Sequence, residues 1–73
     1  MSQLHPGSYI LARAIPDKQT QNRVILDLCD HLSQGEMSLR DARLLITMET
    51  QLGLSDEQIG QIVDFAKNLC RNG

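Results

Sequence analysis

The sequence predicts an all-α fold, a compact three-helix bundle with a short N-terminal helical or extended segment. Three observations lead to this prediction: apolar residues recur at helical spacing in three stretches, residues that favour helix starts precede them, and turn signals separate them. The turn signals are His5-Pro6-Gly7, Pro16-Asp17, Gln34-Gly35 and Leu52-Gly53. Because 73 residues leave room for one small domain, we divide residues 1–73 into an N-terminal segment over 1–16 and helices over 17–34, 38–52 and 55–71.

The N-terminal segment has two possible structures. Ser8 can cap a helix of about two turns. This helix would end at Ile15, because Pro16 disfavours helical geometry at the residue before it. Residues 9–11 can equally form a short strand, but a lone strand would have only another copy of the chain to pair with. We therefore prefer the helix and expect it to lie across one end of the bundle.

The helix expected over 17–34 has one apolar face. Its apolar positions follow the spacing i, i+1, i+4, i+5 and i+8, which is typical of one helical face, and they are Val24, Ile25, Leu28, Cys29 and Leu32. Leu26 falls outside this stripe. Gly35 is a natural left-handed stop for the helix.

The other two long helices carry clear start signals. Ser38 can cap the helix over 38–52, with Gly53 as a left-handed end. Ser55 and Gln58 have the spacing of a capping box, and the apolar residues on either side of this box are placed to close a hydrophobic staple. One apolar stripe then runs through Ile59, Ile62, Val63, Ala66, Leu69 and Cys70.

The helix over 38–52 has more apolar surface than a bundle helix needs. An apolar arc a little over roughly 100° wide suffices for such a helix, whereas more than half of its circumference is covered by Leu39, Ala42, Leu44, Leu45, Ile46, Met48 and Leu52. Two explanations remain open. Either the N-terminal segment covers the additional side, or part of the arc faces a partner.

The surplus identifies a set of candidate partner-binding residues. Leu44 and Met48 lie at the edge of the arc, while Glu49 lies inside it, where a fully buried carboxylate would need a cation. Glu49 can meet solvent or a cation at the end of the bundle, or a cation across an interface. The whole set consists of Leu26, Arg40, Arg43, Leu44, Met48, Glu49 and Phe65.

Composition argues against several classes of function. The net charge of −2 and the absence of a Lys/Arg cluster disfavour nucleic acid as a partner. No apolar run approaches the roughly 20 residues of a membrane span, and the N-terminus lacks the pattern of a secretory signal, so we expect a cytoplasmic protein. Cys29 and Cys70 are expected to be reduced and buried; a bridge between them is possible if the first and last long helices pack side by side.

No catalytic or cofactor motif is found. Cys29 and His31, two residues apart on a helix, point to nearly opposite sides and cannot share a metal ion. Ser8, Ser38 and Ser55 are explained as helix caps rather than as nucleophiles. We therefore expect no metal, no cofactor, no small-molecule substrate and no enzymatic activity.

The expected function is that of a small protein-interaction module: an adaptor, an inhibitor or regulator, or an accessory subunit. It would present an apolar helix surface, edged by Arg40 and Arg43, to a protein partner or to a second copy in a homodimer. The alternative is a nucleic-acid-binding transcriptional regulator that acts as a dimer through the same two arginines.

One resemblance concerns part of the chain. The stretch from Gln34-Gly35-Glu36-Met37-Ser38 through Leu52-Gly53-Leu54-Ser55-Asp56-Glu57 resembles the helix-loop-helix rhythm of tellurite-resistance TerB-like domains. The acidic metal-binding cluster of that family is missing between the helices. The resemblance therefore implies no function and no site.

Overall fold

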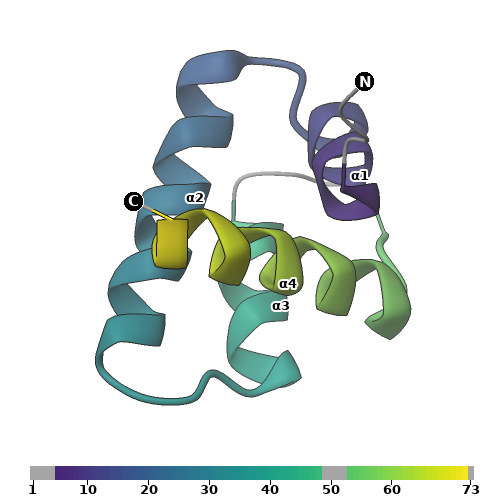
Figure 1. The fold of residues 1–73 in the computed structure, drawn as a ribbon. Helices are drawn as coiled ribbons and strands as arrows, with labels where there is room; N and C mark the ends of the chain where they lie inside the picture. The colour runs from purple at the N-terminus through teal and green to yellow at the C-terminus, as the bar shows by residue number, and fades with distance from the viewer. Residues whose placement is uncertain (1–4, 49–52, 73) are drawn as a thin grey trace.

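The computed structural model describes residues 5–48 and 53–72, which form four α-helices: α1 (Pro6–Ala14), α2 (Lys18–Ser33), α3 (Leu39–Thr47) and α4 (Asp56–Asn72) (Figure 1). The predicted all-α class is confirmed, and the described residues contain no strand. The extended alternative for the N-terminal segment is therefore wrong. None of the helices in this part of the chain is long and apolar enough to cross a membrane.

α4 is the central helix of the fold. Both α4 and α2 contact each of the other three helices, but the contacts of α4 are the more extensive. α1 packs mainly against α4 and more lightly against α2 (Figure 1). α1 makes no contact with α3. α1 therefore does not cover Leu44 and Met48, which stay exposed, while the parts of this explanation that concern residues 1–4 and 49–52 lie outside the described residues.

α1 begins earlier than predicted because His5, and not Ser8, is its N-cap. The Nδ1 atom of His5 accepts a hydrogen bond from the backbone N–H of Gly7 at 2.9 Å. Pro6 occupies the first turn, where the N–H that proline lacks has no partner within the helix. As predicted, the helix stops before Pro16, and Ile15 adopts an extended conformation.

The His5 ring also joins α1 to α4. Its Nε2 atom donates to the Asp64 carboxylate at 2.7 Å, and the ring lies 5.8 Å from that of Phe65, measured between centroids. The bonds at the two nitrogens define one tautomer, with the proton on Nε2. A single side chain thus caps one helix and anchors it to another.

The predicted Ser38 cap of α3 is confirmed, and α2 begins at Lys18 with a cap at Asp17 that was not predicted. The Asp17 carboxylate accepts from the backbone N–H and the hydroxyl of Thr20, at 2.9 and 2.7 Å. The Ser38 hydroxyl accepts from the Asp41 N–H at 3.1 Å. α2 ends where Gly35 takes a positive φ of 144°, a conformation that residues with a β-carbon rarely adopt.

The capping box at the start of α4 is also confirmed. The Ser55 N–H donates to Oε1 of Gln58 at 2.8 Å, and the Gln58 N–H donates to the Ser55 hydroxyl at 3.2 Å. α3, by contrast, ends at Thr47 with Met48 as its C-cap. The predicted continuation over 49–52 lies outside the described residues.

All four helices supply the aliphatic core. Its members are less than a tenth exposed and comprise Leu11, Ala14, Ile15, Val24, Leu28, Ala42, Ile46, Leu54, Ile59, Ile62, Val63 and Ala66. A disulfide between Cys29 and Cys70 adds a covalent link beside this core, with 5.8 Å between the two α-carbons. The expectation of two reduced, buried cysteines is wrong: the last turns of α4 lie beside α2, which brings the two half-buried sulfurs together.

Candidate functional site: the exposed face of α3

One side of α3 carries apolar side chains into solvent. Leu44 is 61% exposed and Met48 is 83% exposed, whereas Ala42 and Ile46 are fully buried. Arg40, Leu44 and Met48 follow one another at intervals of four residues, so they form one stripe along the helix. We call these three residues the α3 face.

The buried side of α3 determines where the α3 face points. The buried side chains of Ala42 and Ile46 hold α3 against the core, and the Ser38 cap holds its first turn. Because residues three and four apart share one side of a helix, burial of that side leaves the stripe outside. The exposed residues Asp41 and Thr47 flank it.

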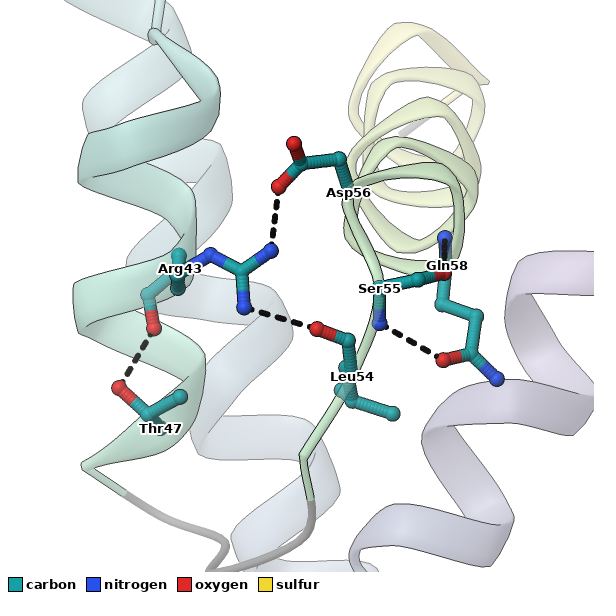
Figure 2. Close-up of polar contacts among 6 residues, drawn as sticks. All are labelled: Arg43, Thr47, Leu54, Ser55, Asp56 and Gln58. Atoms are coloured by element: carbon teal, nitrogen blue, oxygen red, sulfur yellow. Dashed lines mark hydrogen bonds and ion pairs between the residues drawn. The ribbon is translucent and has the colours of Figure 1, made fainter.

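Arg43 does not join the α3 face. Figure 2 shows its guanidinium reaching from α3 to the start of α4, where Nη1 donates to the Leu54 carbonyl at 2.7 Å and Nη2 pairs with the Asp56 carboxylate. The Thr47 hydroxyl donates to the Arg43 carbonyl at 2.7 Å on the same side of the helix. Arg43 therefore links α3 to the start of α4, and its guanidinium is not free to contact a partner.

The remaining candidates are scattered. Leu26 is 67% exposed but belongs to α2, where it lies two residues from the fully buried Val24 and Leu28 and so points away from the core. Phe65 is half-buried on α4, beside the His5 ring. Glu49 lies outside the described residues. Of the seven predicted residues, three lie together on the α3 face: Arg40, Leu44 and Met48.

A second feature was missed by sequence reasoning. A cleft of about 520 Å³ lies between the end of α2, the α2–α3 link and the end of α4. Its lining includes the disulfide and comprises Cys29, Leu32, Ser33, Gly35, Glu36, Lys67, Cys70 and Arg71. The available signal was the position of both cysteines on apolar stripes, with two basic residues within one turn of Cys70.

The α3 face consists of three exposed side chains. It combines one cation with two apolar side chains and offers no nucleophile paired with a base. Among residues 5–48 and 53–72 no three His, Cys, Asp or Glu side chains converge as metal ligands would. A lowered pKa occurs at Asp17, because its carboxylate accepts hydrogen bonds from the Thr20 hydroxyl and backbone N–H, but this group caps α2 and lies outside the face.

The chain matches no protein-family model, no curated protein and no solved structure. The resemblance of residues 34–57 to TerB-like domains thus gains no support from these comparisons.

Proposed function

We propose that this protein, a three-helix bundle with a short N-terminal helix, is a protein-interaction module of the adaptor, inhibitor or accessory-subunit kind. It docks the α3 face into an apolar groove of a larger protein partner in the cytoplasm. The observation that carries the proposal is the exposure of Leu44 and Met48 on successive turns of one helix.

Leu44 and Met48 remain largely exposed after folding, so their burial in a complex would contribute to binding. Full burial of a leucine or methionine side chain stabilises by about 1.5–3 kcal/mol. In a helix-in-groove complex, apolar anchors at i and i+4 enter pockets of the partner. Met48 suits such a role because its flexible thioether adapts to irregular apolar surfaces.

The area of the α3 face favours a concave partner over a second copy of the chain. A stable specific interface buries about 800 Å² per partner, roughly a seventh of the 5306 Å² accessible surface of this chain. α3 has nine residues, so it is only about 14 Å long. Two convex α3 faces would touch along one narrow line, whereas a groove would cover the stripe and both of its flanks.

Charge adds a further requirement for the partner. Arg40 is exposed at the first turn of the stripe, so the matching end of the groove should carry an acidic group. The nucleic-acid alternative relied on Arg40 and Arg43 together. Because Arg43 is bound to Leu54 and Asp56, only Arg40 would remain to contact nucleic acid. We therefore do not favour the nucleic-acid alternative.

The proposal is tested by affinity capture from lysate of the native host, with quantitative mass spectrometry. Leu44→Asp and Met48→Asp place a charge on the α3 face, and Leu26→Asp is the matched control at an equally exposed leucine on α2. We expect the wild type and the control to capture the same protein, and both α3 variants to lose it by about tenfold or more, because burial of an unpaired charge is costly.

Two results contradict the proposal. One is capture that all three variants leave unchanged while their circular dichroism stays helical. The other is a wild-type dimer in sedimentation equilibrium that Met48→Asp converts to monomer, since the α3 face would then bind a second copy of the chain.

A further inference from the structure

The Cys29–Cys70 disulfide lies in the wall of a cleft that opens to solvent. Both cysteines are half-buried and are among the residues that line the cleft of about 520 Å³. A disulfide sealed inside a core is protected from attack, whereas access is one of the factors that set the rate of thiol–disulfide exchange. The position of this disulfide therefore permits thiol–disulfide exchange in addition to its role as a cross-link.

The charge around the disulfide differs from that of the whole chain. Lys67 and Arg71 line the same cleft and flank Cys70 in sequence, three residues before it and one after it, while Glu36 is the acid among the lining residues. Two cations and one anion leave the cleft with a formal charge of +1, although the chain carries −2. Such a cleft attracts small anions.

From this geometry we infer that the disulfide is an exchange site for small anionic thiols of the glutathione class, which Lys67 and Arg71 steer into the cleft. A first thiolate attacks Sγ of Cys29 and forms a mixed disulfide with it. The Cys29–Cys70 bond breaks, and its electron pair leaves on Sγ of Cys70 as a thiolate, which the two cations stabilise and water can protonate.

A second thiolate completes the reaction. It attacks the small-molecule sulfur of the mixed disulfide, releases the oxidised thiol as its own disulfide and leaves Cys29 as a thiolate. Two small thiols are thereby oxidised by two electrons, and the protein disulfide is reduced by two. The last turns of α4 lose their covalent link to α2, so the fold responds to the redox poise of its surroundings.

This inference agrees with the proposed cytoplasmic location but does not depend on docking by the α3 face. Cytosolic disulfides in most organisms are transient and serve catalysis or redox sensing, because small thiols and their enzymes keep cysteines reduced. An exchange-active disulfide is the kind that such a compartment tolerates. Loss of partner binding by the α3 variants would leave the exchange reaction unaffected.

The test compares rates of disulfide reduction by two thiols of opposite charge, the anion glutathione and the cation cysteamine. Reduction is followed near neutral pH and at low ionic strength by alkylation and mass spectrometry. The test variant is Lys67→Gln/Arg71→Gln, and the control is Arg13→Gln/Lys18→Gln, which removes the same charge from exposed positions outside the cleft. The ratio of the two rates cancels changes in stability, because looser packing would speed both thiols alike.

We expect the glutathione-to-cysteamine ratio to fall by about threefold or more in the Lys67→Gln/Arg71→Gln variant and to stay at the wild-type value in the control. Salt at about 0.5 M should remove the difference, because it screens exposed charges beyond a few ångströms. Equal ratios in both variants would overturn the steering role. A wild-type disulfide that stays intact in about 10 mM glutathione would overturn the exchange site itself.

Discussion

Gly7 of α1 lies so close to Gln61 of α4 that a β-carbon at residue 7 would stand 2.1 Å from the Gln61 carbonyl oxygen. The same carbon would lie 2.8 Å from Cβ of Phe65. Two helix backbones meet here without room for one methyl group. We therefore expect Gly7→Ala to force α1 and α4 apart and to lower the free energy of unfolding by about 1–3 kcal/mol, measured by urea denaturation.

Gly60 provides the matched control within α4. A β-carbon there would meet Cδ2 of Leu39 at 3.8 Å, an ordinary contact. Because alanine favours a helix interior over glycine, Gly60→Ala should raise the free energy of unfolding by about 0.5–1 kcal/mol. The close approach of α1 and α4 would be contradicted if both substitutions stabilised the protein.

The two arginines of α3 should respond differently to removal. Arg43→Ala loses the bonds to the Leu54 carbonyl and the Asp56 carboxylate. Since the pair with Asp56 is well exposed to solvent, we expect a loss of only about 1–2 kcal/mol in the free energy of unfolding. Arg40→Ala should change it by no more than about 0.5 kcal/mol and should weaken partner binding instead. A reversed order in thermal unfolding would show that Arg43 is not the structural arginine.

The disulfide should supply a large share of the stability. Cys29 and Cys70 are separated by 41 residues, and closure of a loop of that length stabilises by about 3–4 kcal/mol in the chain-entropy model. A domain of this size has a total of roughly 4–11 kcal/mol. The Cys29→Ser/Cys70→Ser variant should therefore unfold at much lower urea concentration. A midpoint equal to that of the oxidised wild type would contradict this account.

The N-cap of α2 predicts a dependence on pH. Hydrogen bonds from Thr20, first from its hydroxyl and then from its backbone N–H, hold the pKa of the Asp17 carboxyl below its ordinary value. A carboxyl with a depressed pKa in the folded state stabilises above its unfolded pKa of about 4, and this contribution is lost as the pH falls through the folded pKa.

Asp17→Asn separates the charge from the cap, because asparagine also caps helices but does not ionise in this range. The wild type should have the higher Tm at neutral pH, and its advantage over Asp17→Asn should shrink as the pH is lowered to about 2. A difference in Tm that is the same at both pH values would show that the ionised carboxylate contributes nothing.

Local features of the fold were predictable from the sequence, and distant ones were not. The Ser38 cap and the capping box of Ser55 and Gln58 depend on residues at most three apart, and the structure confirms both. The N-cap of α1 was missed although its bond to Gly7 is local, because histidine is not among the usual capping residues. The other bond of the His5 ring, to Asp64, spans 59 residues. No periodicity contains such a pairing, because it depends on how α1 packs against α4.

The candidate site divides in the same way. The helical wheel identified more apolar surface than α3 needs, and Leu44 and Met48 are indeed exposed. The wheel could not show that Arg43 pairs with Asp56, because the two residues lie on different helices. It also could not show that Phe65 would lie beside the His5 ring of the N-terminal segment.

The most direct measurement of partner docking is photo-cross-linking in host cells from single positions of the intact chain. A benzophenone amino acid replaces Met48 in one strain and Leu26 in a second, the latter as the control on α2. We expect irradiation to join the chain through position 48 to one larger protein, with no such adduct from position 26. The proposal is contradicted if position 48 yields only the chain joined to itself, or if position 26 yields the larger adduct and position 48 does not.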